Sequence, residues 1–417
     1  MKTITSLCCG LLLLTGLGPH ARGESFRTDI NPALLYYQAF LLAPELSAAD
    51  NNYLVTNQWV GWQPLPDRFG SLMAGYQNEL GCLKQAMNQK VPCDWGIDLS
   101  RGPETLLPHV ALCKQAVIKA QWDIMWRLQQ GDQAAARDDL LASLTLGRNT
   151  SRDRTLIGAL VEIAIESVVC TTVAEDFGRF SPETLQQLAE GFEQAPVRGT
   201  LAAALATERG MHPDWLDWLI GRVEAAQQAH PHDEAAVMEE LHQEFIHFAP
   251  EMETSYWLQF TNGPAGTPDG VIKMAREATV WYERLAGLST LPHGQFEEQF
   301  NQLSAEANKS GNIMFLRDLS GWSSGRQKEF RIQGQLAMVK AAVAYKLHGE
   351  AGLKSVNDPN GNGPFACKRF VFQGVDRGFQ LTSPLLFSHA PMSCIFVEKD
   401  GPPFSVFGAH VGEAVTP

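Results

Sequence analysis

The sequence lacks a surplus of basic residues and contains few charged residues of either sign. Only 19% of its 417 residues are charged, and 33 Lys and Arg stand against 46 Asp and Glu, which gives a formal net charge of −13. A chain without a basic surplus releases few phosphate counterions, so we expect no nucleic-acid partner and no attachment to anionic lipid. Hydrophobic residues make up 45% of the chain, enough for a sizeable core, which excludes a disordered or fibrous protein.

Motifs that would hold a metal or a nucleotide are also missing. The chain contains no C-x-x-C pair, no H-E-x-x-H and no phosphate-binding P-loop. His242 and His247 lie five positions apart, so on a helix their rings point to different sides and do not form a zinc-protease site. We therefore expect no cofactor and no metal, and the sequence by itself assigns no reaction.

The N-terminus has the pattern of a secretory signal peptide over residues 1–23. Lys2 supplies the positive start, residues 7–17 form an apolar run, and small residues precede the expected cleavage after Gly23. The run is too short to cross a bilayer, so we expect no stable membrane span once it is removed. These features predict a periplasmic or secreted protein.

Six cysteines follow the signal. An even number of cysteines in an oxidising compartment suggests disulfide bonds. We predict two local pairs: Cys82 with Cys93, which would close the loop after a helix, and Cys367 with Cys394, which would tie two strands together. The remaining two cysteines lie within helical patterns, where a free cysteine behaves as a small buried hydrophobic residue.

The spacing of apolar residues predicts a mostly α-helical fold, an antiparallel array of helical hairpins (bundle or solenoid-like) that occupies residues 24–350. Asn31-Pro32 and Ser181-Pro182 have the cap and proline typical of helix starts. The other expected helices cover 67–90, 103–129, 132–148, 153–177, 197–228, 233–248, 271–288, 294–308 and 327–349.

After Gly349 the pattern changes to turns and short alternating runs. This predicts a small β-rich C-terminal segment, residues 351–417, that adds an antiparallel β element to the helical domain. The expected strands cover 369–373, 379–382, 393–398 and 404–407.

Two stretches resemble known proteins. The first contains the motifs Cys93-Asp94-Trp95-Gly96, Gly102-Pro103, Leu106-Leu107-Pro108-His109, Gly131-Asp132 and 159–166. With these motifs it is similar to a family of uncharacterised exported bacterial helical proteins. The resemblance implies an exported helical fold over about residues 32–210 and no activity.

The second stretch, 336–383, contains Leu336, Ala344-Tyr345, Gly349, Asp358-Pro359, Gly361, Pro364-Phe365, Phe370, Gly378-Phe379, Leu381 and Ser383. With these residues it resembles the C-terminal module of type II secretion pseudopilins and related exported proteins. The resemblance implies a helix that leads through an Asp-Pro turn into a β-hairpin, and a secretion-system accessory as a further hypothesis. A pseudopilin also keeps a long apolar N-terminal helix, which this chain replaces by a short signal.

Paired acidic residues are the first candidates for chemistry. Glu162 and Glu166 are four positions apart in an otherwise apolar helix, so they share one stripe of it. Such carboxylates can share a proton, act as acid and base, or form ion pairs with arginines such as Arg127 or Arg148. Glu208 follows another apolar run and is expected to face the same interior.

A cluster of acids and tryptophans forms the second candidate. Asp214, Trp215, Asp217 and Trp218 combine two carboxylates with two large rings, as in sites where rings stack on sugars and acids act across the glycosidic bond. Tryptophans at helical spacing also pack between helices, so this interpretation competes with a structural one.

These observations leave three functional hypotheses. The leading one is an exported binding or envelope-associated interaction protein whose partner is a protein or a glycan. The second is a secreted glycan-acting hydrolase with an all-helical toroid, and the third is the secretion-system accessory.

Overall fold

The computed structural model describes residues 27–57, 59, 63–99, 105–248, 257–258, 261–263, 265–387, 390–402 and 404–408. The side chains at 208–215, 245, 247, 248, 317, 318 and 387 lie outside this description. The expected signal peptide also lies outside it.

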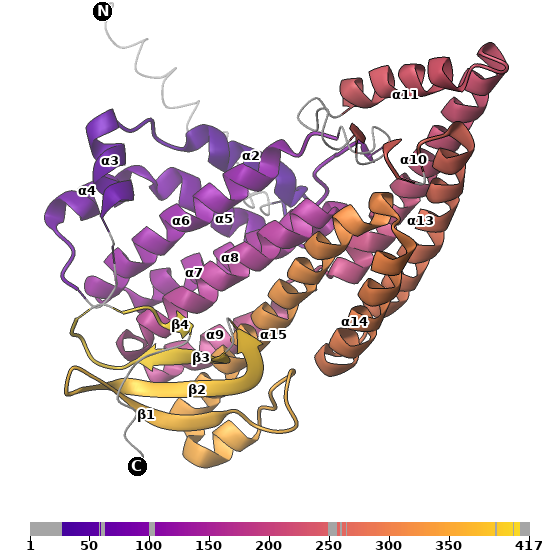
Figure 1. Ribbon diagram of the computed structural model, residues 1–417. Helices are drawn as coiled ribbons and strands as arrows, with labels where there is room; N and C mark the ends of the chain where they lie inside the picture. The colour runs from indigo at the N-terminus through magenta and orange to yellow at the C-terminus, as the bar shows by residue number, and fades with distance from the viewer. Residues whose placement is uncertain are drawn as a thin grey trace, which may run out of the picture.

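The first part of the chain is a layered set of antiparallel helices (Figure 1). Short turns join the longest of them, so that α6, α7 and α8 pack side by side as hairpins. The helices of this part are α2 (Pro32–Leu42), α3 (Ala48–Thr56), α4 (Asp67–Gly75), α5 (Gln77–Met87), α6 (Pro108–Gln129), α7 (Gln133–Thr150), α8 (Leu156–Glu175) and α9 (Pro182–Gln194).

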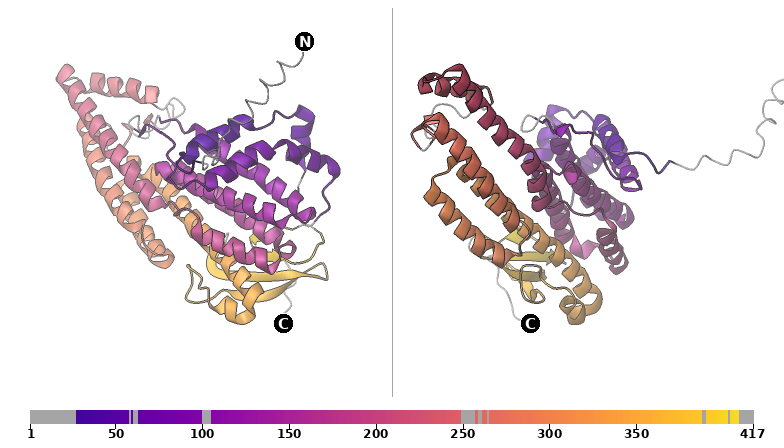
Figure 2. Two further views of the ribbon diagram at one scale, coloured as in Figure 1. Left: turned by 180° about the vertical axis from the view of Figure 1, so that it is seen from behind. Right: turned by 90° about the vertical axis from the view of Figure 1, so that its right-hand side faces the viewer.

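The second part extends from this set as an arm and then returns. In Figures 1 and 2, α10, α13 and α14 run alongside one another away from the first helices, with α11 near the far end, and α15 leads back to the sheet. The helices of this part are α10 (Leu201–Ala229), α11 (Glu234–Phe248), α13 (Pro268–Leu288), α14 (His293–Ser310) and α15 (Ile313–Lys354).

Side-chain caps explain where several helices begin. The Asn31 side chain accepts a hydrogen bond from the Ala33 amide at the start of α2, and Ser181 accepts one from Thr184 at the start of α9. Each cap satisfies an N–H group that the helix itself leaves without a partner. Both starts agree with the sequence prediction.

The chain ends in a four-stranded antiparallel sheet of order β1-β2-β3-β4. Its strands are β1 (Ala366–Phe372), β2 (Val375–Phe387), β3 (Ala390–Val397) and β4 (Phe407–Gly408). Phe379 and Phe396 stack on neighbouring strands, and both rings meet Phe177, just beyond the end of α8, with centroids 5.6 and 5.1 Å away. The sheet therefore contributes to one continuous core with α8 and α15.

The predicted fold class, mostly helical with a C-terminal antiparallel β element, is confirmed. The differences lie at boundaries. The expected helix 67–90 is two helices that meet at Tyr76. Helix α15 starts at Ile313 rather than 327, because Asn312 caps it, and α3 was not predicted. Gly349, where the sequence pattern changes, has a non-helical φ of 60° inside α15.

Within the described chain, α8 alone has the length and apolar composition that crossing a membrane requires. Here it packs between α7 and α15 in the core. Glu162 and Glu166 project from it and are both buried.

Close packing at Gly70 gives a first test of this arrangement. A Cβ atom at Gly70 in α4 would lie 2.1 Å from the Trp126 ring of α6, whereas a Cβ at Gly81 in α5 would meet nothing within 4 Å. We expect Gly70→Ala to lower the free energy of unfolding by about 1–3 kcal/mol through overpacking. The matched control, Gly81→Ala, should be neutral or stabilising by up to about 1 kcal/mol because alanine favours a helix. Urea unfolding of both variants measures the difference, and equal effects would contradict it.

Candidate functional site

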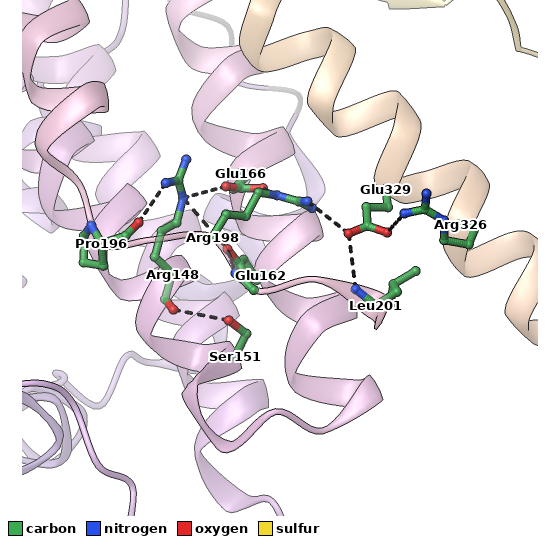
Figure 3. A network of polar contacts seen from close by, with 10 residues as sticks. Arg148, Ser151, Glu162, Glu166, Pro196, Arg198, Leu201, Arg326 and Glu329 are labelled. Carbon is green, nitrogen blue, oxygen red and sulfur yellow. Dashed lines mark hydrogen bonds and ion pairs between the residues drawn. The ribbon is translucent and has the colours of Figure 1, made fainter. Parts of the chain in front are cut away.

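A buried network of ion pairs joins α7, α8, α15 and the linker between α9 and α10 (Figure 3). Its centre is Glu166, which is fully buried. One of its carboxylate oxygens accepts a hydrogen bond from Arg148 Nε at 2.8 Å, and the other accepts one from Arg198 Nε at 2.7 Å. One carboxylate thus pairs with guanidinium groups from two separate segments.

Glu329 of α15 continues the network. Its carboxylate accepts hydrogen bonds from Arg198 Nη1 at 3.4 Å and from the Leu201 amide at 3.2 Å, and it also pairs with Arg326. The Leu201 amide belongs to the first residue of α10, so Glu329 also satisfies an N–H group at the positive end of that helix.

Glu162 holds the linker from the other side. Both of its carboxylate oxygens accept from the Gly199 amide, at 3.2 and 3.0 Å. Burial and the neighbouring Glu166 carboxylate raise the pKa of Glu162 to about 8. A Cβ at Gly199 would lie 2.4 Å from Ser151 Oγ and 2.6 Å from Glu162 Oε2, so this close approach requires glycine.

A pocket of about 510 Å³ borders the same linker at Pro196. Its walls come from the start of α2, the end of α5 with the loop 88–93, one face of α7 with Arg152 after it, and the end of α9 with Pro196. Arg148 Nη1 donates to the Pro196 carbonyl at 2.8 Å, which connects the ion-pair network directly to this wall. The network therefore holds the Pro196 end of the pocket wall.

A stack of three rings packs behind the pocket residue Asn149. Trp95 lies between the rings of Tyr36 and His109, with centroids 5.5 and 4.3 Å away. Trp95 Nε1 donates to the carbonyl of Asn149, and the Asn149 side chain donates to the Tyr36 hydroxyl. Asn149 also lines the pocket, so these contacts hold one of its polar groups in place.

His109 and Asp153 form a second buried polar pair next to this stack. Both are shielded from solvent, and His109 Nε2 lies 3.5 Å from Asp153 Oδ2. The other Asp153 oxygen accepts hydrogen bonds from the amide and hydroxyl of Thr155, which caps α8. The pair therefore fixes the turn that follows α7.

The sequence candidates fall into separate places. Glu162 and Glu166 are buried and belong to the ion-pair network; of the two arginines named, Arg148 is the partner, whereas Arg127 pairs with Asp123 and Asp132. This favours the structural interpretation of the two glutamates over acid–base chemistry, because neither lines the pocket.

The acid–tryptophan candidates lie in the arm. The side chains of Glu208, Asp214 and Trp215 are outside the described residues. Asp217 and Trp218 are exposed on α10, and Asp217 is 16 residues beyond Leu201, about 24 Å along the helix. Nothing in the described part of the chain brings Asp217 together with Glu162.

The predicted disulfides are absent, and all six cysteines after residue 23 are free. Cys367 and Cys394 both align with Leu381, from the two strands that flank β2. Two strand spacings put them about 9.5 Å apart, beyond the reach of about 7 Å that a disulfide allows.

The loop between Cys82 and Cys93 also fails to close. The Lys90 amide donates to the Thr28 carbonyl at 3.1 Å, and the Asp94 amide donates to the Asn31 side chain at 3.1 Å. These bonds draw the segment around Cys93 onto the start of α2 rather than back onto α5.

We expect thiol counting to reflect this geometry. Alkylation in denaturant without a reductant, followed by peptide mass mapping, should find Cys367 and Cys394 unlinked to each other, and likewise Cys82 and Cys93. Recovery of either linked peptide pair would show that the strand register or the 88–94 loop differs from the one described here.

The chain also contains one serine motif. Gly321, Ser323 and Gly325 fit G-x-S-x-G, the pattern of a hydrolase nucleophile. That chemistry needs a strained turn from a strand into a helix, whereas these residues lie inside α15, two to three turns after its start. The motif therefore has helical backbone and does not form a nucleophile elbow.

The pocket residues Lys90, Asn149 and Arg152 were not among the sequence candidates. A signal was present nonetheless: the stretch Cys93-Asp94-Trp95-Gly96 and His109, which carry the first resemblance, build the stack and one wall of the pocket. The sequence did not show that α7 and α9 supply the other walls of this pocket.

Comparisons with family models, with curated proteins and with solved structures find no match to this chain.

Proposed function

We propose that this protein is an exported binding protein that holds a small polar ligand in the pocket between α2, α5, α7 and α9. The observation that carries the proposal is the coupling of a pocket of about 510 Å³ to a buried network that fixes its wall. Burying the carboxylates of Glu166 and Glu329 among three arginines costs desolvation energy, and such networks are weak evidence for stability alone. Because the network bonds to Pro196 in the pocket wall, we infer that its role is to hold that wall in one geometry.

The composition of the lining supports binding rather than a reaction. Amide side chains such as Asn88 and Gln194 offer both donors and acceptors, while Leu141 and Pro32 supply apolar surface. Cys93 also lines the pocket, but burial raises the pKa of its thiol to about 12, although Arg152 opposes this. A thiol with so high a pKa is a poor nucleophile at neutral pH.

Blocking the pocket tests the proposal. Ala195 lines it at the end of α9, whereas Val197, two residues further on, is 79% exposed and lies outside the lining. A library of small polar compounds should yield ligands that raise the melting temperature of the wild-type protein. We expect Ala195→Trp to reduce their affinity at least tenfold and the matched control Val197→Trp to leave it unchanged.

The result that would count against binding at this pocket is equally specific. If ligands found in the screen bind Ala195→Trp as tightly as wild type, their site lies elsewhere and the proposal is wrong. If no compound binds the wild-type protein while Ala195→Trp folds normally, the pocket has no small ligand in that library and the proposal is again contradicted.

The hydrolase and the secretion accessory remain weaker hypotheses. In the region of the second resemblance, α15 leads through a turn in which the Asp358 amide donates to the Gly363 carbonyl, and then into the β1–β2 hairpin. That geometry concerns local structure and does not name a partner. Glu224 lies on the same face of α10 as Asp217, about two helical turns away, but it pairs with Arg276 at 4.0 Å.

A further inference from the structure

We infer that the ligand of this pocket is a small organic anion, a carboxylate or a phosphate, held by Lys90 and Arg152. This inference rests on the proposed function and adds the charge of the ligand. Among the described residues that line the pocket, these two are the charged ones, and both are basic. They occur in a chain in which acidic residues outnumber basic ones by 46 to 33.

Neither cation pairs with another described side chain of the protein. Within the described part of the chain, the side chains of Lys90 and Arg152 have no hydrogen-bond or ion-pair partner, while most arginines around them, such as Arg148 and Arg198, are paired. Arg152 acts electrostatically on the Cys93 thiol, which places its charge close to the pocket wall. The two cations come from different walls, Lys90 from the loop after α5 and Arg152 from the turn after α7.

Three helix ends oppose an anion, and their strength can be weighed. α5, α7 and α9 all end at the pocket, and each helix C-terminus carries about half a negative charge, whereas α2 begins there with about half a positive charge. The two full positive charges of Lys90 and Arg152 exceed the sum of these partial charges, so the net field favours an anion. The carbonyl groups of the helix ends also accept hydrogen bonds, which favours an anion that carries hydroxyl or amino donors.

A fixed wall beside the two cations favours selection among anions. Arg148 binds both the Glu166 carboxylate and the Pro196 carbonyl, so the Pro196 end of the pocket wall is held in place. Recognition of a carboxylate or phosphate by Arg and Lys through charge-assisted hydrogen bonds needs such fixed surroundings.

Matched probes test the charge of the ligand. Malate, glycerol phosphate and inorganic phosphate serve as anions, and malamide serves as the uncharged counterpart of malate. By isothermal titration at low salt, we expect at least one anion to bind, and malamide to bind at least tenfold more weakly than malate. The anion that binds distinguishes a carboxylate site from a phosphate site.

Charge variants locate the effect. Arg152→Gln and Lys90→Gln should each weaken anion binding by about tenfold, as expected for loss of one charge-assisted hydrogen bond. The controls Arg154→Gln and Lys114→Gln remove exposed cations outside the lining and should change nothing. Circular dichroism of all four variants confirms that they are folded.

Cys93 gives a second readout that needs no ligand. Iodoacetate and iodoacetamide have similar size and differ in charge, and the ratio of their alkylation rates cancels the thiolate fraction of each cysteine. The largest effect of a neighbouring charge comes from Arg152 at Cys93, ahead of Asp94 and Asp153, and from Glu350 at Cys367, ahead of Arg369 and Glu398. We therefore expect the iodoacetate-to-iodoacetamide rate ratio to be higher at Cys93 than at Cys367. Arg152→Gln should remove the difference.

The outcomes separate the two claims. Suppose that uncharged compounds bind and that Ala195→Trp weakens their binding. If no anion binds, or if Arg152→Gln and Lys90→Gln leave the affinity for anions unchanged, the binding function stands and the anion inference is overturned. If anion binding survives Ala195→Trp, the anion site lies outside the pocket and the inference is also overturned. Equal alkylation ratios at Cys93 and Cys367 count against it in the same way.

Discussion

Glu166→Gln is expected to lower the free energy of unfolding by about 3–5 kcal/mol, the range measured when one partner of a buried ion pair is removed. Glu166 is fully buried, and its two oxygens accept hydrogen bonds from Arg148 and Arg198. The amide leaves two partly buried guanidinium groups facing one neutral side chain that also presents a donor. Urea unfolding monitored by circular dichroism measures the loss.

The matched control is Glu162→Gln, one helical turn away. Glu162 accepts hydrogen bonds from the Gly199 amide, and its pKa of about 8 means that it is largely protonated at pH 7. An amide therefore replaces a mostly neutral carboxyl. We expect Glu162→Gln to lower the free energy of unfolding by at least about 2 kcal/mol less than Glu166→Gln does. Equal losses would show that the charge of Glu166 does not organise the network.

Folding stability is expected to fall by an amount on the order of a few kcal/mol as the pH rises from about 5 to about 8. Burial raises the pKa of Asp176 to about 7 and that of Glu162 to about 8, from ordinary values of 3.8 and 4.5. Between the ordinary and the raised value, the folded chain keeps a proton that the unfolded chain loses, so each step up in pH favours unfolding. Above about pH 9 the folded chain has lost these protons as well, so the dependence should level off.

Two variants test the origin of this dependence. Asp176→Asn removes a titrating group whose Arg179 partner lies 3.8 Å away, and thermal unfolding of this variant should vary less between pH 5 and 8. Glu398 behaves in the opposite way: burial opposes ionisation, but hydrogen bonds from Lys346 and Arg369 lower its pKa. Glu398→Gln should therefore keep the wild-type slope between pH 5 and 8. A slope that Asp176→Asn leaves unchanged would place the titrating groups elsewhere.

The sequence prediction was wrong where the structure depends on contacts between distant segments. Cys367 and Cys394 have the spacing of a strand pair, but β2 lies between them, and the order of strands is not written in the distance between two cysteines. The predicted start of α15 was too late. Ser310-Gly311 ends α14, and Asn312 caps α15 directly after it, so the two helices are joined without the longer loop that the prediction left between them. The acids Glu162 and Glu166 were identified correctly as unusual, but their role depended on arginines far away in the chain.

Local chemistry was sufficient for the parts that depend on neighbouring residues. Asn31-Pro32 and Ser181-Pro182 start helices because each cap bonds to an amide only two or three residues away, and Gly349 changes the chain direction through its own φ. The mostly helical character and the terminal sheet follow from the same short-range patterns.

The site required the tertiary structure. Glu166 meets Arg198 across 32 positions and Arg198 meets Glu329 across 131, and the pocket joins Lys90 to Arg152 through helices that no spacing rule brings together. The free energy of burying a charge depends on which partner reaches it. That partner is set by the packing of whole helices, which is decided by their apolar faces rather than by the charged residues themselves.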